Sequence, residues 1–391
     1  METEIATKFK DTDIGLIPEE WEFDSLDNHA DVLMGQSPES KFYNNIEGTP
    51  FLQGIRTFGE KYPTYDTYTT KVTKLAPGGS VLLSVRAPVG EVNIADRDVC
   101  IGRGLMSINS KNNEFIYQLF KAFKDYVVGK ETGTVYGSVT REVIAKLKFP
   151  FPPQAEQDKI SEILSSIDNK IELNRKINLN LEKLGSFLFK EWFIDVDNQQ
   201  IGKVSDLIRV ESGFPFHSSM FDENGDYKLV TIKNVQDGFF VPKCTDSLSE
   251  IPAKVPTHCR LNNGDILLSL TGNVGRVCFV YGENYLLNQR VANLVPVDEN
   301  NRAFTYFLFR QKDFQNTLIG ISRGTAQQNL SPIETKSLEI PIPSQDMLDR
   351  FADVANPIFQ KLVENYNEIK NLSTLRDSLL PRLMNGKIRT V

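Results

Sequence analysis

The sequence has few residues of the kinds that build disulfide frameworks, metal centres or catalytic pairs. Its 391 residues include four cysteines and three histidines. The cysteines form no CxxC pair, which favours a reduced cytoplasmic protein over a disulfide scaffold. No spacing of cysteine and histidine is that of a zinc site, and no nucleophile–base pair stands out. The sequence therefore predicts neither a metal centre nor a catalytic centre.

Long apolar runs are also absent. The longest are far shorter than the roughly 20 residues that a membrane-spanning helix needs. The N-terminus is acidic and polar, unlike that of a signal peptide. We therefore expect a cytoplasmic protein that makes no contact with a membrane.

Motifs for nucleotide binding and for DNA chemistry are missing as well. Residues 54–61 resemble a phosphate-binding loop, but Glu60 stands where lysine is required, and a carboxylate there would repel phosphate. The Asn/Asp-Pro-Pro-aromatic motif of adenine methyltransferases is absent. No acidic-x-Lys arrangement of a nuclease follows a Pro-Asp pair. We expect no cofactor to bind this chain.

The net charge of −7 is unevenly distributed along the chain. Residues 39–150 carry fifteen basic and eleven acidic side chains, whereas residues 1–38 carry two basic and ten acidic ones. Neutralised phosphates usually supply most of the affinity for DNA. Tight DNA binding by the isolated chain is therefore not expected, and a positively charged partner would be needed.

The chain repeats itself, and the repeat determines the expected architecture. Residues 79–90, GSVLLSVRAPVG, align with residues 264–275, GDILLSLTGNVG, at an offset of 185. Further matches follow in the same order, and Phe149-Pro-Phe-Pro matches Ile340-Pro-Ile-Pro at an offset of 191. Agreement over more than a hundred residues is not expected of two unrelated strand–turn patterns. The sequence predicts two similar globular domains.

Each copy reads as strands, a short helix and then a long helix. Short β-branched strands alternate with Gly, Pro and Asn turns, and a short helix is expected near 114–127 and near 303–318. A proline-rich segment then enters a helix of about 40 residues. We predict an α+β protein in which two similar α/β domains are separated by paired long antiparallel helices, with internal pseudo-twofold symmetry. The expected boundaries are 1–153, 154–196, 197–343 and 344–391.

Heptad-like stripes predict that the two long helices pair as a coiled coil. Pro357 lies within the second stripe, which predicts a kink or a later helix start. The midpoints of the two segments are both asparagines, Asn174 and Asn365, separated by the repeat offset of 191. Equivalent residues of an antiparallel pair meet only at its symmetry axis. We therefore expect these two amides to face each other and to fix the helix register.

Three segments resemble type I restriction–modification specificity subunits. They are Gly15-Leu-Ile-Pro-Glu-Glu-Trp21, the exit Pro-Phe-Pro-Pro-Gln-Ala-Glu-Gln157, and the ending Leu375-Arg-Asp-Ser-Leu-Leu-Pro-Arg-Leu-Met-Asn-Gly386. The second copy lacks the Ile-Pro-Glu-Glu-Trp element. The resemblance, which covers essentially the whole chain, implies a non-catalytic subunit whose two target-recognition domains each read half of a split, asymmetric DNA site. The helices would set the spacer between the halves.

The resemblance also implies partners. Methyltransferase subunits would dock on the helices, and motor–nuclease restriction subunits would complete the complex on double-stranded DNA. S-adenosylmethionine, ATP and Mg²⁺ would bind those partner subunits. Two other hypotheses stay open: an orphan DNA-binding adaptor of another defence complex, and a coiled-coil module whose end domains bind protein.

Candidate DNA-binding residues come from comparing the two copies, because domains that read different bases should differ at loop tips and agree in the scaffold. Arg86 would pair with guanine and Asn273 with adenine, although turn chemistry unrelated to DNA explains the difference equally well. Arg56 and Lys233 would contact phosphate. The complete set is Arg56, Arg86, Arg103, Thr134, Tyr136, Ser138, Lys233, Asn234, Thr271, Asn273, Arg276, Arg323, Thr325, Gln327, Gln328 and Asn329.

Overall fold

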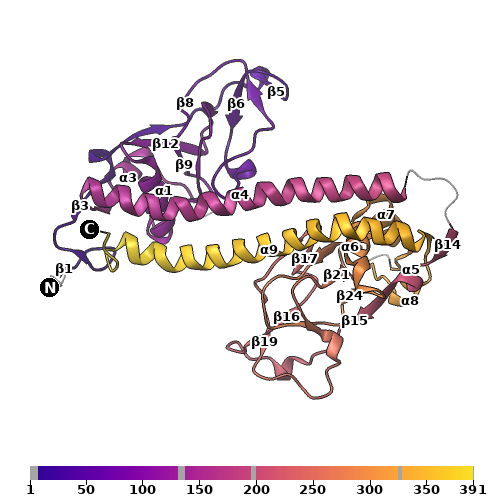
Figure 1. The fold of residues 1–391 in the computed structure, drawn as a ribbon. Helices are drawn as coiled ribbons and strands as arrows, with labels where there is room; N and C mark the ends of the chain where they lie inside the picture. The colour runs from indigo at the N-terminus through magenta and orange to yellow at the C-terminus, as the bar shows by residue number, and fades with distance from the viewer. Residues whose placement is uncertain (1–7, 131–136, 195–199, 325–327, 391) are drawn as a thin grey trace. The chain divides into compact units, whose positions relative to one another are not determined.

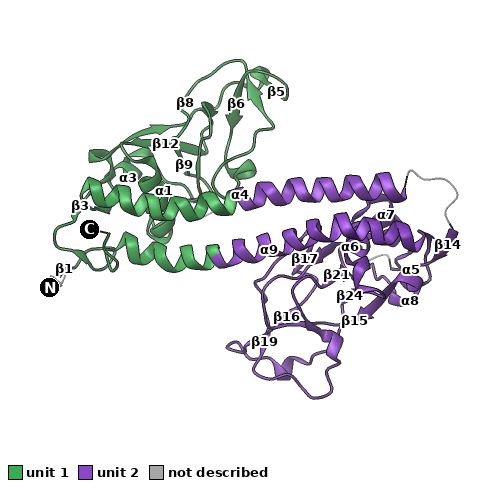
Figure 2. Cartoon of the chain, viewed as in Figure 1, with its two compact units in different colours: residues 1–172, 372–391 green, residues 173–371 purple. Residues whose placement is uncertain are grey.

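The computed structural model describes residues 8–130, 137–194, 200–324 and 328–390. The chain folds into two compact units (Figure 2), residues 1–172 with 372–391 and residues 173–371. This division differs from the four segments expected, because it passes through both long helices. Each unit holds one globular domain together with a portion of each helix, since those helix segments pack on the domain of their own unit.

Unit 1 combines antiparallel and mixed sheets with short helices (Figure 1). One sheet has the strand order β10-β9-β12-β4 and another has the order β5-β7-β6-β11-β8, in which β6 and β11 are parallel. Its strands are β1 (Phe9–Lys10), β2 (Ile17–Pro18), β3 (Glu22–Ser25), β4 (Ala30–Met34), β5 (Tyr43–Asn44), β6 (Thr49–Leu52), β7 (Tyr68–Thr69), β8 (Leu75–Ala76), β9 (Val81–Ser84), β10 (Val92–Ile94), β11 (Val99–Ile101), β12 (Leu105–Ser110) and β13 (Lys148–Phe151). Its short helices are α1 (Asn113–Ala122), α2 (Lys124–Val128) and α3 (Arg141–Lys146).

Unit 2 repeats this plan. Its sheet β15-β24-β21-β22 matches the first sheet of unit 1, and β19-β16-β23-β20 again contains a parallel pair, β16 and β23. The strands are β14 (Gln200–Lys203), β15 (Ile208–Ser212), β16 (Tyr227–Val230), β17 (Val235–Gln236), β18 (Phe239–Phe240), β19 (Ser247–Leu248), β20 (Arg260–Leu261), β21 (Ile266–Ser269), β22 (Val277–Phe279), β23 (Tyr285–Leu287), β24 (Val291–Pro296) and β25 (Glu339–Ile342). The short helices are α5 (Val204–Leu207), α6 (Arg302–Arg310), α7 (Lys312–Ile321) and α8 (Pro332–Lys336). The internal repeat is therefore a repeat of structure.

Two 40-residue helices, α4 (Gln154–Phe193) and α9 (Gln345–Met384), begin and end at positions 191 residues apart. As the residue number rises along α4, the number of its partner on α9 falls. Asp168 accepts a hydrogen bond from Arg376 in unit 1, and Asn178 accepts one from Asn365 in unit 2. The predicted antiparallel pairing of the helices is thus confirmed.

Of the two outcomes predicted from Pro357, a kink or a later helix start, the later start is wrong, because α9 runs through this proline without interruption. A proline inside a helix costs roughly 3 kcal/mol in hydrogen bonding and steric clash. The neighbouring residues offset that cost by burial. Ala355 and Phe359 are buried, and the Asn356 side chain accepts from the backbone of Ala303 and donates to that of Asn300.

The three segments that carried the family resemblance meet in unit 1 around Glu156, on the first turn of α4. This buried carboxylate accepts from the Trp21 indole at 3.1 Å and from the Arg389 guanidinium at 2.7 and 2.9 Å. Gly386, in the left-handed region at φ 71°, lies so close to Pro18 that an added Cβ would be 2.3 Å from its ring. The C-terminal tail therefore ties the N-terminal segment to the start of α4.

The predicted pairing of Asn174 with Asn365 is wrong by one helical turn. Asn365 donates to Asn178 at 2.8 Å, and Asn174 donates to Glu368 at 2.8 Å. The prediction aligned the two helices end to end. Instead, Arg389 of the C-terminal tail binds Glu156 on the first turn of α4. The end of α9 therefore does not lie opposite the start of α4, and α9 is shifted along α4.

The amide pair of Asn178 and Asn365 allows a test of register in unit 2. Both residues are buried, and the Asn178 amide nitrogen has no partner. Asn365→Leu alone should lower the free energy of unfolding by about 1–3 kcal/mol, because it leaves the Asn178 oxygen unpaired. Replacing both asparagines by leucine should restore or exceed the original stability. Denaturant titration of the single and double variants measures this, and additive losses in the double variant would contradict it.

Candidate nucleic-acid interface

The turn that follows β9 or β21 is built in the same way in both copies. In unit 2 the Ser269 hydroxyl donates to the Asn273 carbonyl and accepts from the Arg276 N–H at 3.0 Å. In unit 1 the Ser84 hydroxyl donates to the Pro88 carbonyl at 2.7 Å and accepts from the Glu91 N–H at 2.9 Å. Each serine therefore holds a rigid turn whose tip residues differ between the copies.

Each turn lies beside a second segment of its own unit that also contains candidate residues. In unit 1, Arg86 forms an antiparallel bridge with Ser138. In unit 2, Thr271 bridges Asn329, and the Gly272 N–H donates to the Gln328 carbonyl at 3.2 Å. The structure thus brings together candidates that lie 52 to 58 residues apart in the chain. We call the two regions reading ends: Arg86 to Pro88 with Ser138 in unit 1, and Thr271 to Asn273 with Gln328 and Asn329 in unit 2.

The candidates differ in how accessible they are. Arg86, Arg103, Lys233, Asn273, Gln328 and Asn329 are exposed, whereas Ser138, Thr271 and Arg276 are partly buried. The Thr271 hydroxyl is buried without a partner. Thr134, Tyr136, Thr325 and Gln327 lie outside the described residues. The exposed side chains are those that can reach a nucleic acid directly.

Two of the arginines are already paired. Arg56 makes a two-pronged contact with Asp66 at 2.6 and 2.7 Å, and the bond from this guanidinium holds the Asp66 pKa below its ordinary value. Arg323 pairs with Glu334. A phosphate would have to compete with these carboxylates, so the contact predicted for Arg56 requires its pair with Asp66 to open.

Asn234 is a structural residue, so its assignment to the DNA-binding set is wrong. Its side chain is buried, accepts from the Thr231 backbone, and donates to the carbonyls of Val241 and Lys243. These bonds hold the short hairpin of β17 and β18. The comparison of the copies could not separate it from Lys233, its exposed neighbour in the same loop.

A polar hollow adjoins the turn in each unit, and sequence reasoning had missed both. In unit 1 it has a volume of about 490 Å³, with Gly90, Glu91, Lys121 and Lys124 in its lining. The unit 2 hollow of about 290 Å³ has the equivalent turn residues Gly275 and Arg276 in its lining, together with Lys312, Gln315, Asn273, Gln328 and Asp237. The signal available in the sequence was the pair of glycines Gly90 and Gly275, which stand at the same place in the two aligned segments.

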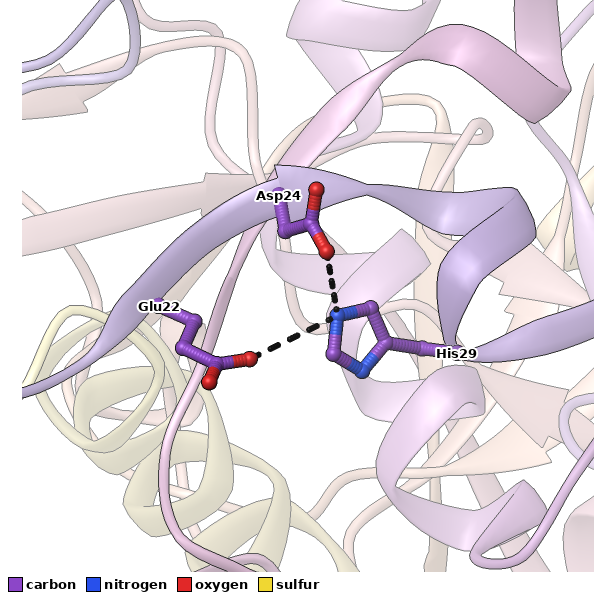
Figure 3. Close-up of side chains that lie close together, drawn as sticks. All are labelled: Glu22, Asp24 and His29. Carbon is purple, nitrogen blue, oxygen red and sulfur yellow. Dashed lines mark hydrogen bonds and ion pairs between the residues drawn. The ribbon is translucent and has the colours of Figure 1, made fainter.

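A second polar cluster lies in unit 1 at the exit towards α4. Glu22 and Asp24 of β3 face the His29 ring (Figure 3), which stacks on Phe151 at a centroid distance of 3.7 Å. The His29 Nε2 is 3.1 Å from Asp24 and 3.9 Å from Glu22. Bonds from Asn28 and from the Ser25 backbone lower the Asp24 pKa. These groups are of the types that ligate cations, and in this structure the His29 ring hydrogen-bonds Asp24 and stacks on Phe151.

The cysteines are free thiols. Burial raises the pKa of Cys244 to about 12 and that of Cys259 to about 11. Thiols of that kind stay protonated and are poor nucleophiles. Among the described residues, no helix has the length and apolar character needed to cross a bilayer.

Comparison with known proteins assigns the chain to a family. The model of the type I restriction modification DNA specificity domain matches residues 18–183 and again residues 197–371. The chain is 27% identical over 421 residues to the type I restriction enzyme MjaIX specificity subunit of Methanocaldococcus jannaschii, covering 98% of this chain and 97% of that protein. It is 42% identical over 182 residues to the putative MjaX specificity subunit of the same organism, covering 45% and 43% of the two chains.

The fold is also that of a solved relative. The crystal structure of the type I restriction–modification system S subunit from M. genitalium matches 93% of this chain and 96% of that chain, with a TM-score of 0.66 and 18% identity. The two matches to the family model fall one on each copy of the internal repeat. This chain belongs to the family of type I restriction modification DNA specificity proteins and carries two copies of the domain.

Proposed function

We propose that this chain is the DNA-recognition subunit of a cytoplasmic type I restriction–modification complex, and that each unit reads one half of a bipartite, asymmetric site. The observation that carries the proposal is the pair of reading ends. They share one serine-held scaffold but present different groups, Arg86 in one copy and Asn273 in the other. Two domains that share a backbone scaffold but differ in the side chains at the turn are suited to recognising different DNA sequences.

The chemistry of modification and cleavage belongs to partner subunits in this proposal. Methyltransferase subunits bring S-adenosylmethionine, and restriction subunits bring ATP and Mg²⁺. The chain has a net charge of −7, so cations of the partners would enclose the DNA backbone. A continuous α4 of 40 residues, with a rise of about 1.5 Å per residue, would set the distance between half-sites.

Exposed apolar residues on the long helices support the docking of two copies of one partner. Leu184 and Leu375 are 191 residues apart and are 46% and 47% exposed. Ile163 and Val354, again 191 apart, are 38% and 46% exposed. Each unit thus offers the same two positions to solvent, one on each helix. We propose that each unit seats one methyltransferase subunit there.

Charge placed at one of these positions should remove one partner copy. Leu184→Lys or Leu375→Lys would desolvate an unpaired ammonium group at the interface, at a cost of about 2 kcal/mol or more, which is roughly a 30-fold loss of affinity. Native mass spectrometry of the complex should show one methyltransferase copy in place of two. Leu179→Lys is the matched control, since Leu179 is 57% exposed but its equivalent is Lys370. Two copies in all three variants would refute this docking site.

The function itself is tested by purifying the chain with its methyltransferase partner and selecting bound sequences from random duplex DNA. The proposal predicts one bipartite motif with a fixed spacer. Binding without sequence preference, or failure to associate with any methyltransferase, would favour the adaptor and protein-interaction alternatives.

A further inference from the structure

The second reading end holds an asparagine, Asn273, whose side-chain amide lies against the guanidinium of Arg276. When its oxygen faces the Arg276 guanidinium, Asn273 accepts from the two terminal nitrogens of Arg276 at 2.8 and 3.2 Å. Arg276 is itself anchored, because it also donates to the Gln236 side chain. The turn beneath is held by the Ser269 hydroxyl and by Gly272 and Gly275, both in the left-handed region.

This arrangement determines which half of the amide can face a ligand. An amide oxygen has two lone pairs, and Arg276 approaches it with both terminal nitrogens. The NH₂ group then remains as the donor that Asn273, an exposed residue, presents at the edge of the unit 2 hollow. The usual contact of asparagine with adenine needs both halves of the amide, with the oxygen accepting from N6 and the nitrogen donating to N7. Asn273 cannot make that two-part contact, because its oxygen already accepts from Arg276.

We infer that Asn273 reads an acceptor-bearing base edge, best matched by the adjacent O6 and N7 of guanine, and that Arg276 is the positioning residue that makes it a donor. This inference replaces the adenine pairing expected from the sequence, and it rests on the proposed function. Unit 1 also presents a hydrogen-bond donor at its turn, because the guanidinium of Arg86 has donors and no acceptor. Its residue equivalent to Arg276 is Glu91, which pairs with Lys124 at 2.5 Å and has no asparagine to orient.

The substitution Asn273→Asp tests the polarity of the contact. One carboxylate oxygen would stay on Arg276 and the other would face the DNA as an acceptor. The preferred base at one position of one half-site should change from guanine to one that presents an amino group, cytosine or adenine, with at least a tenfold change in relative affinity. The assay is selection from random duplexes by the complex of the chain with its methyltransferase subunits.

The substitution Arg276→Met tests positioning separately from charge. Without Arg276 the Asn273 amide can turn over, so adenine should be tolerated alongside guanine at that same position. The other positions should keep their preferences. Arg260→Met, which removes an exposed arginine of the same unit away from this hollow, is the control for lost charge and should leave every preference unchanged.

Each outcome of the selection decides between the claims. If the unaltered complex selects no motif, the proposed function fails. If it selects one, but Asn273→Asp changes no position in either half, Asn273 is not a reader and the inference fails. A loss of affinity shared equally by all sequences in Arg276→Met would show Arg276 to be a backbone contact and would likewise overturn the inference.

Discussion

Exchange of residues 30–147 for the corresponding segment of a relative with a different target should change one half of the methylated sequence completely and leave the other half intact. The segment contains Arg86 and Ser138, the first reading end, but no residue of unit 2. Strand β3 and its antiparallel partner β13 stay native, so the approach of the chain to α4 is preserved. The result follows because each unit has its own sheets and its own core.

The reciprocal exchange of residues 208–337 serves as the matched control. It replaces the second reading end and should change only the other half-site. Sequencing of the methylated DNA made by each chimera provides the measurement. A chimera that alters both half-sites together would show that the two units do not read independently.

The second large effect concerns the ion pair of Glu156 and Arg389 in unit 1. Arg389→Met should lower the stability of this unit by about 3 kcal/mol, because it leaves the Glu156 carboxylate buried without its cation. Arg382→Met, which changes an exposed arginine of the last turn of α9, should have little effect. Hydrogen exchange of the peptides around β2 and the start of α4 measures whether the N-terminal segment stays packed on α4. Equal protection in both variants would contradict this role of Arg389.

The same pair predicts a pH dependence. Burial raises the Glu156 pKa, but bonds and charge from Arg389, with the bond from Trp21, lower it by more, so the net shift is downward. A carboxyl whose folded pKa lies below its unfolded value stabilises the fold above the unfolded pKa, and that contribution is lost as pH falls through the folded pKa. The stability lost in Glu156→Gln should therefore be full at neutral pH and should shrink below about pH 4.5. A loss that does not vary with pH would point to packing alone.

The architecture could be predicted from the sequence because internal repeats and apolar helix stripes are visible as local patterns of residues. An offset of 191 predicted two helices at equivalent places, and both begin within a residue of the expected positions. Residue spacing could not give the mutual register of the helices. That depends on the tail that follows α9, whose contact with Glu156 joins segments of the chain 233 residues apart.

The reading ends show the same limit at the scale of side chains. Comparison of the copies selected Thr271 and Asn329 as separate candidates, and the structure places them side by side. It could not tell Asn234, which is buried in its own hairpin, from Lys233, which is exposed. Nor could it foresee that Arg276 would engage the oxygen of Asn273, since that contact depends on the turn held by Ser269.

Mapping of methylated adenines in the genome of the source organism, with and without this gene, tests the central claim most directly. We expect that one bipartite, asymmetric motif is methylated only when the gene is present, and that Asn273→Asp rewrites a single position in one of its halves. An unchanged set of methylated motifs after deletion would contradict the assignment of this chain as the subunit that selects the sequence.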